Sequence, residues 1–220
     1  GYFLGQDQPP GKLNSDANRR CAASLLAAKK GGYDPVDILI EHCAEKGLEL
    51  WTDFRIQQDY AYDYAGGFGY DFNSPFTQAH QGWRHVDRHG QVCSHLFSHF
   101  HAGWEQYKLD LLAELARKGP AGIHLNLMCE LNAIWDLEPG AVSRFKDEYH
   151  IDPTLDPEPP EEWYQFRCDH LTEFIRRLRQ QTTKIAAELG KAIPISVQVS
   201  GEWAILKHKK LVKAVSQNHL

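Results

Sequence analysis

The chain has 220 residues, 42% of them hydrophobic and 24% charged, and this composition is ordinary for a globular protein. Its net charge of −5, without a basic stripe that interleaves aromatic residues, argues against nucleic acid as a partner. No apolar run approaches the roughly 20 residues that cross a bilayer, so a membrane partner is not expected either.

Three stretches of the chain each combine a helical pattern with a short apolar run that is typical of a buried strand. The helical patterns cover Asp34–Gly47, Trp104–Gly119 and Trp163–Gly190, and the apolar runs cover Leu48–Phe54, Ile123–Met128 and Ile193–Val199. Each helical pattern ends at a glycine, as expected where a helix must stop before a strand. A helix that leads into a buried strand is the repeat unit of α/β folds, so the sequence predicts an α/β protein.

The first of these helices has a clear start and an apolar stripe. Asp34 is a good N-cap, and Pro35 suits the first helical position, where no backbone N–H is needed. The apolar positions of this helix recur at helical spacing, and we expect them to face the core. They are Val36, Leu39, Ile40 and Cys43.

Two long segments follow the first and second predicted strands. Residues 55–103 show little periodicity and hold many aromatic side chains, Trp83 among them. Aromatic platforms with polar rims suit the apolar faces of sugar rings, although the same side chains could serve only to pack the loop. Residues 131–162 form the second segment, in which a short helical piece is expected at Phe145–Tyr149, before an acidic stretch rich in proline (IDPTLDPEPPEE). Loops of this length are usually functional or carry small elements of their own.

Six histidines in the first long segment raise the question of a metal site. His95 and His99 would share one face of a helix, and His99 and His101 one face of a strand, so either pair could hold a metal ion. No third ligand stands at a fixed spacing, and surface or hydrogen-bonded histidines are the preferred interpretation. The five cysteines contain no C-x-x-C pair, which disfavours a disulfide framework and a thiolate zinc site. No metal or cofactor is therefore predicted.

Three blocks of the chain together resemble the glycosyl-hydrolase-like 10 family, a group of glycosidase-like proteins with TIM-barrel folds. The blocks are Asp34–Gln58 (DPVDILIEHCAEKGLELWTDFRIQQ), His101–Cys129 (HAGWEQYKLDLLAELARKGPAGIHLNLMC) and Phe145–Arg179, and they follow the order of the family. The resemblance implies a (β/α)8 TIM-type barrel with long loops at the carboxyl ends of its strands, and a carbohydrate substrate.

The end of the central strand departs from the family pattern. His124 and Asn126 stand where the family usually has Glu-x-Asp, and Cys129 stands where it has Arg, with Glu130 one place later. Arg55 matches a family Arg that follows the preceding strand. Asn126 can hydrogen-bond to a sugar but cannot act as a nucleophile or an acid. This chain is therefore expected either to use other carboxylates or to bind glycans without cleaving them.

Active sites of TIM barrels lie at the carboxyl ends of the strands, and glycoside hydrolysis needs two carboxyl groups across the scissile bond. The carboxylates predicted to lie there are the catalytic candidates Glu130, Glu202 and Asp53. The residues predicted to bind substrate are Arg55, Asn126, His124, Trp83 and Trp203.

Three hypotheses of function follow from these residues. The first is a glycoside hydrolase with Glu130 and Glu202 as acid and base. The second is a carbohydrate-binding barrel that has lost its catalytic carboxylates, and the third, less favoured, is a zinc-dependent hydrolase that uses the histidine-rich loop. Two carboxyl groups that face one cleft would favour the glycoside hydrolase. A cleft lined by aromatic side chains without such carboxyl groups would favour the binding barrel, and three histidines close enough to share a metal ion would favour the zinc-dependent hydrolase.

Residues 1–220 are interpreted as one barrel domain that is incomplete. An eight-stranded barrel typically needs ~250 residues, whereas three strands are clear in this sequence and a fourth is suggested at Tyr2–Leu4. The remainder of the barrel is expected from the same parent chain. The strand at Ile193–Val199 should then have an unpaired edge, and the flanking helices should leave apolar side chains bare.

Overall fold

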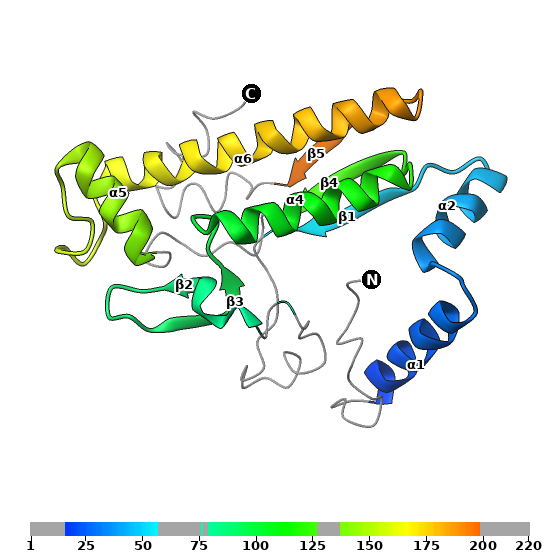
Figure 1. Cartoon of the computed structure of the whole chain (residues 1–220), viewed down its shortest axis with the longest axis horizontal. Helices are drawn as coiled ribbons and strands as arrows, with labels where there is room; N and C mark the ends of the chain where they lie inside the picture. Colours follow the sequence, from blue (N-terminus) through cyan, green and yellow to red (C-terminus); the bar gives the residue numbers. More distant parts are fainter. Residues whose placement is uncertain (1–15, 57–75, 77–78, 127–136, 199–220) are drawn as a thin grey trace.

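The computed structural model in Figure 1 describes residues 16–56, 76, 79–126 and 137–198. Its elements in chain order are α1 (Asp16–Lys30), α2 (Pro35–Glu45), β1 (Trp51–Arg55), η3 (Gln81–Trp83), β2 (Arg84–Val86), β3 (Val92–Phe97), α4 (Ala102–Arg117), β4 (Gly122–Asn126), α5 (Pro139–Tyr149), α6 (Glu161–Glu188) and β5 (Ile195–Gln198). The pairs α2–β1, α4–β4 and α6–β5 confirm the three predicted helix–strand units and the α/β class. The described strands form one sheet of three and one of two rather than a closed barrel.

Strands β1, β4 and β5 form a parallel sheet with β4 in the centre. The register places Asp53 of β1 beside His124 of β4, and His124 beside Ser196 of β5. Parallel neighbours need a crossover connection, which α4 and α6 supply. Within the described ranges β5 pairs with β4 alone, so its other edge, predicted to be unpaired, carries no strand there.

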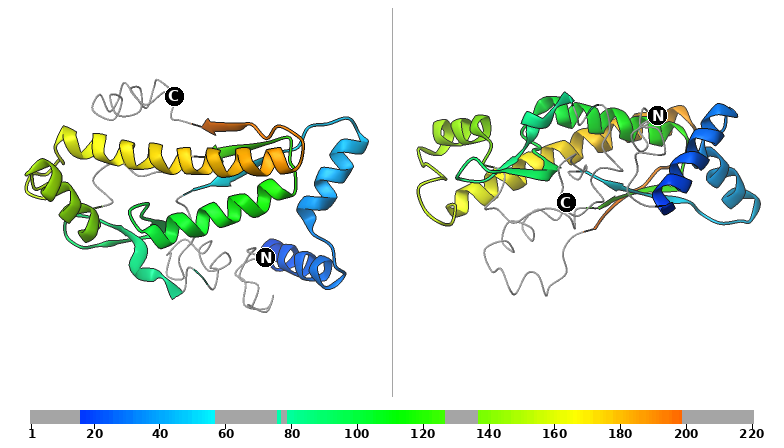
Figure 2. Two further views of the ribbon diagram at one scale, coloured as in Figure 1. Left: turned by 45° about the horizontal axis from the view of Figure 1, so that its top comes forward. Right: turned by 90° about the horizontal axis from the view of Figure 1, so that it is seen from below.

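Helices α4 and α6 lie side by side over one face of this sheet, and the main core lies between them and the strands (Figure 1, Figure 2). Ile123 and Leu125 of β4 are fully buried beneath the two helices. Leu112 of α4 and Phe174 and Leu178 of α6 meet them and are fully buried as well. Truncating one such side chain to Ala typically costs about 2 to 5 kcal/mol, so this core holds the three-stranded sheet and both helices together.

The three glycines predicted to end helices all adopt the left-handed backbone conformation. Gly47, Gly119 and Gly190 have φ of 67°, 72° and 66° and follow the last residues of α2, α4 and α6. A side chain in this conformation would clash with the backbone, which is why glycine is the usual residue at helix ends. The helix ends are therefore set locally by the sequence.

The segment before α4 carries small elements that its weak periodicity did not predict, namely η3 and the antiparallel hairpin of β2 and β3. Aromatic side chains pack this segment onto α4. Phe97 stacks on Trp104 with ring centroids 4.1 Å apart, and Phe76 stacks on Tyr107 at 3.7 Å. For Phe76 and Phe97, the structure therefore shows the second of the two roles considered for these aromatic side chains, which is packing of the loop.

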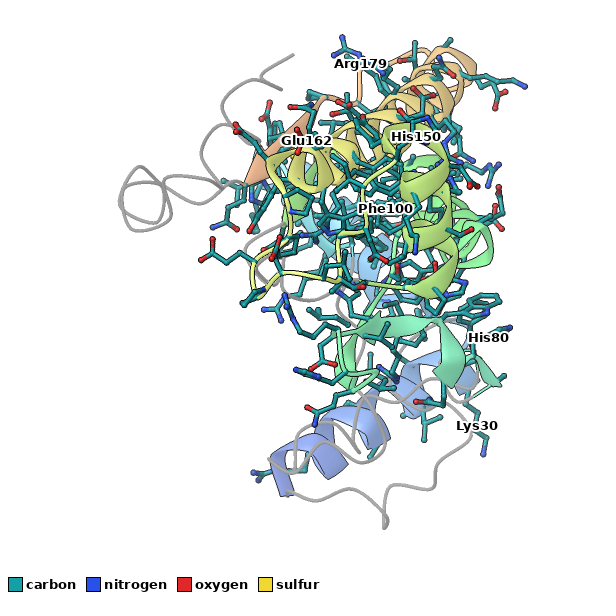
Figure 3. The ribbon with its side chains drawn as sticks, turned by 90° about the vertical axis from the view of Figure 1, so that its left-hand side faces the viewer. Lys30, His80, Phe100, His150, Glu162 and Arg179 are labelled. Carbon is teal, nitrogen blue, oxygen red and sulfur yellow. The ribbon has the colours of Figure 1, made fainter. Side chains whose placement is uncertain are left out.

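Helix α5 is longer than the short piece expected at Phe145–Tyr149, because Glu138 caps it. The Glu138 carboxylate accepts hydrogen bonds from the backbone N–H groups of Gly140 and Ala141 at 2.9 and 2.8 Å. A second core cluster joins α5 to the start of α6, and the partly buried Phe100, labelled in Figure 3, packs against it. Its buried members are Leu137, Ala141, Phe145, Trp163 and Phe166.

The prediction that α2 turns an apolar stripe toward the core is wrong for this structure. None of its residues is buried, and Leu39 is 51% exposed. The helix instead lies beyond the amino end of the sheet, where Lys118 at the end of α4 contacts Asp34 at 2.8 Å and Asp37 at 2.9 Å (Figure 1). Burial opposes ionisation of Asp34, but hydrogen bonds from Lys118 and from the Val36 backbone outweigh it and lower its pKa. The amphipathic pattern predicted the helix and its N-cap correctly, but not the surface that covers it.

Trp51 of β1 lies against Gly122 of β4, and this close approach can be tested. A Cβ atom added at Gly122 would lie 2.5 Å from the Trp51 indole, whereas one added at Gly82 would meet nothing within 4 Å. We expect Gly122→Ala to lower the free energy of unfolding by about 1 to 3 kcal/mol, because the indole must be displaced. Gly82→Ala should be neutral or slightly stabilising, since alanine restricts the unfolded chain.

Urea denaturation of both variants measures this difference. In the Trp51→Ala background the penalty of Gly122→Ala should vanish, as a double-mutant cycle would show. Equal stability of Gly122→Ala and Gly82→Ala would mean that the indole does not lie on Gly122.

Candidate functional site

The face of the sheet opposite α4 and α6 is polar. Because side chains alternate along a strand, the residues that alternate with the partly buried Phe54 and the buried Ile123 and Leu125 point to this second face. Its polar side chains are exposed on β1 and half-buried on β4 and β5. They are Asp53, Arg55, His124, Asn126, Ser196 and Gln198.

The parallel register arranges these side chains as two rows across the strands, which we call the middle row and the carboxyl row. The middle row is Asp53, His124 and Ser196, and the carboxyl row, two residues nearer the strand ends, is Arg55, Asn126 and Gln198. In the middle row, His124 Nδ1 and Ser196 Oγ lie 2.7 Å apart and share a hydrogen bond. Between the rows, Asn126 Nδ2 donates to Asp53 Oδ2 at 3.4 Å. Hydrogen bonds thus join side chains that lie more than 70 residues apart in the sequence.

Trp51 begins the same face at the amino end of β1. Its indole covers Gly122 and donates to Glu49 Oε2 at 3.5 Å, yet Trp51 remains 42% exposed. Sequence reasoning did not select Trp51, although it stands two residues before Asp53 and therefore on the same side of the strand. The face combines one exposed aromatic platform with two rows of hydrogen-bonding groups.

The structure brings together four of the residues predicted for the site, namely Asp53, Arg55, His124 and Asn126. Trp83 lies elsewhere. Its indole packs at 4.0 Å from the His80 ring and 5.7 Å from the His101 ring, and it lies against Gly103. The predicted residues Glu130, Glu202 and Trp203 lie outside the described residues.

A buried lysine connects α4 to the carboxyl end of β1. Lys108 is 5% exposed, and its Nζ donates to the backbone oxygen of Arg55 at 3.3 Å. The same ammonium group lies 4.4 Å from the ring centroid of Trp104 and 5.1 Å from that of Phe54. These contacts compensate for part of the lost hydration of the charge and hold the backbone of Arg55 at the end of the strand.

A buried carboxylate joins α4 to α6 on the helix side of the sheet. Glu105, which is 3% exposed, pairs with Arg177 through Oε2 and with His170 through Oε1, the latter at 3.2 Å. His170 Nε2 also lies 2.8 Å from the backbone oxygen of His99. Sequence reasoning missed this network, because Glu105 and Arg177 are 72 residues apart and no local pattern links them.

His99 is buried beside this network and its pKa is held well below 6.5. Burial is the largest cause, since it disfavours the charged imidazole, and the nearby His85 and His170 add to the effect. Within the described ranges, no group of three or more His, Cys, Asp or Glu side chains is placed to hold a metal ion. A search of the described helices likewise finds none with the length and apolar character needed to cross a membrane.

No family model matches the chain, and no curated protein matches it significantly. The function must therefore be inferred from the side chains on the polar face of the sheet.

The buried His99 predicts a loss of stability at mildly acidic pH. In the unfolded chain this histidine binds a proton near its ordinary pKa of 6.5, whereas the folded protein keeps it neutral to a lower pH. The unfolded state therefore binds more protons as the pH falls below this value, and the free energy of unfolding decreases by up to about 1.4 kcal/mol per pH unit. We expect His99→Gln to flatten this dependence between pH 7 and pH 5.

Urea unfolding at several pH values measures the slope, and His89→Gln, at an exposed position, is the matched control. The control should keep the wild-type slope. An unchanged slope in His99→Gln would show that another group causes the loss of stability.

Proposed function

We propose that the chain is a carbohydrate-active protein that binds a poly- or oligosaccharide on the polar face of β1, β4 and β5. The observation that carries the proposal is the exposed Trp51 beside two rows of hydrogen-bonding side chains. Sugars present apolar C–H faces and a rim of hydroxyl groups. An indole packs against the former, while carboxylate, guanidinium and amide groups bond to the latter.

The dimensions of the face suit an extended ligand. Four residue steps separate Trp51 from Arg55, a distance of about 13 Å along the strand. The side chains along this path change from aromatic to charged and amide groups. A chain of sugar units could contact the platform and both rows together, which a single small ion could not do.

Several features support a TIM-type barrel as the setting of this face. Parallel strands follow one another in the sheet in chain order, and their connecting helices α4 and α6 cover the same face. A doubly wound sheet has helices on both faces and strands that are apolar on both, whereas here the second face is polar. The carboxyl row lies at the end of the strands where barrel active sites are found. The resemblance to the glycosyl-hydrolase-like 10 family points the same way.

As an enzyme, this protein would be a glycoside hydrolase. The mechanism needs two carboxyl groups across the scissile bond, one of which protonates the leaving oxygen. Asp53 is the carboxylate that the described strands present on this face, while Glu130 follows β4 and Glu202 follows β5. We propose Glu130 and Glu202 as acid and base, with Asp53, Arg55 and Asn126 around the sugar.

A binding-only barrel is the alternative, and a specific observation favours it. Asn126 stands where the family usually has a carboxylate, and its amide is hydrogen-bonded to Asp53. Neither His124 nor Asn126 replaces the missing carboxyl group. Release of sugar from a bound polysaccharide distinguishes a glycoside hydrolase, which cleaves the polysaccharide, from a binding-only barrel, which does not.

A panel of polysaccharides, assayed both for binding by affinity electrophoresis and for release of reducing ends, tests the proposed site. We expect Trp51→Ala to weaken binding of the recognised polysaccharide roughly tenfold, because the stacking platform is lost; tenfold corresponds to about 1.4 kcal/mol. Tyr33→Ala is the matched control, since Tyr33 is 63% exposed and lies outside the face. Equal binding by both variants would exclude the face as the glycan site.

Asn126→Asp tests whether the chain is an enzyme. The new carboxylate would lie within hydrogen-bonding distance of Asp53, and two carboxylates this close repel each other. If the wild-type chain cleaves the glycan, we expect this variant to release sugar at least tenfold more slowly, while Glu130→Gln should abolish release and retain binding. Release that arises only in Asn126→Asp would instead identify the wild type as the binding-only form.

A further inference from the structure

The middle row of the polar face contains the three side-chain types of a nucleophilic hydrolase. Asp53, His124 and Ser196 lie on adjacent strands at paired positions, in that order across the sheet. The Ser196 hydroxyl and the His124 imidazole share a hydrogen bond of 2.7 Å. A serine bonded to a histidine is the nucleophile–base pair of hydrolases in unrelated folds, where a nearby carboxylate supports the histidine. Asp53 is the carboxylate beside His124 in the register, and its own hydrogen bond comes from Asn126 Nδ2.

We infer that Ser196 is a nucleophile activated by His124, that the neighbouring Asp53 carboxylate stabilises the imidazolium formed during the reaction, and that the face hydrolyses carboxylic esters. This activity goes beyond glycan binding and does not depend on it. The geometry is accessible, because Asp53 is exposed and His124 and Ser196 are half-buried on the face opposite α4 and α6.

The reaction balances with water as the second reactant. Ser196 Oγ attacks the ester carbonyl carbon while its proton moves to His124 Nδ1. The tetrahedral intermediate collapses, the C–O bond to the alcohol breaks, and the leaving alcohol takes the proton from His124. Water then attacks the acyl group on Ser196, with His124 again accepting and returning the proton, and releases the carboxylic acid.

The oxyanion of such an intermediate needs hydrogen-bond donors, and the carboxyl row can supply them. The backbone N–H groups of the central strand β4 serve the sheet ladder on both sides, so donors next to His124 come from side chains. Arg55, Asn126 and Gln198 all carry N–H groups and lie on the same face, about 6.6 Å along the strands from the middle row. Asn126 is the donor beside the central histidine.

The surroundings of Ser196 indicate a small acyl group. Among the described residues of β4 and β5, its neighbours on this face are the polar Gln198 on the same strand and Asn126 diagonally across, and these strands add no apolar side chain here for a long acyl chain. The substrate class is therefore a short-chain carboxylic ester of an alcohol.

Two probes test the inference on the intact chain without any glycan. A fluorophosphonate labels activated serines, and its site is read by peptide mass spectrometry, while p-nitrophenyl acetate reports ester hydrolysis. We expect the label on Ser196 of the wild type, and Ser196→Ala should lose the label and at least 100-fold of the hydrolysis rate. Ser143→Ala, at an exposed position of α5, is the matched control and should retain both.

Further variants distinguish a catalytic role of His124 and Asp53 from a purely structural one. His124→Gln keeps a hydrogen-bonding group beside Ser196 but removes the base, so it should lose the label like Ser196→Ala. Asp53→Asn should slow labelling, whereas Asp53→Glu should recover part of the rate, because a carboxylate is restored; a merely structural role predicts no such recovery. A folded wild type without label on Ser196, or Ser196→Ala with unchanged ester hydrolysis, would overturn the inference.

Discussion

The two-residue alternation of β4 is the constraint on which the site depends. Ile123 and Leu125 are fully buried beneath α4 and α6, so Gly122, His124 and Asn126 must point to the other face. A slip of one residue would expose the two apolar side chains and bury the polar ones, at a large cost in free energy. Burial of the core face therefore fixes the register, and the register places His124 between its neighbours on β1 and β5.

The ionic network between α4 and α6 complements this apolar core. Glu105 is buried and meets both Arg177 and His170, while Lys108, one turn further along α4, reaches the end of β1. Buried charges cost free energy to desolvate, and their value lies in specifying one arrangement of the groups that must pair. We interpret the network as a device that sets how the two helices pack at the carboxyl end of the sheet. Because Lys108 of α4 also donates a hydrogen bond to the backbone oxygen of Arg55, the position of α4 is linked to the backbone of the carboxyl row.

Much of the fold was predictable because its signals are local. The glycines that end helices and the short apolar runs gave the three helix–strand units, and positions near strand ends predicted that Asp53, Arg55, His124 and Asn126 would meet. The hairpin of β2 and β3 was missed, since its stability comes from aromatic contacts with α4 rather than from its own pattern. The partners of Glu105 and of Ser196 were missed for a related reason, because each depends on a contact across 72 residues. The apolar stripe of α2, none of which is buried, shows that periodicity predicts a helix without saying what covers it.

The glycan and ester proposals place different demands on one polar surface. The first depends on Trp51 and on both rows, and the second on the middle row with hydrogen-bond donors from the carboxyl row but not on Trp51, so either can stand without the other. Their common claim is that this face of the sheet meets the ligand. Hydroxyl-radical footprinting with mass spectrometry, with and without a polysaccharide that the chain binds, measures that claim directly. We predict that Trp51 and His124 lose reactivity when the polysaccharide is present, while the exposed Tyr33 does not. Unchanged reactivity of Trp51 and His124, with protection confined to other parts of the chain, would contradict it.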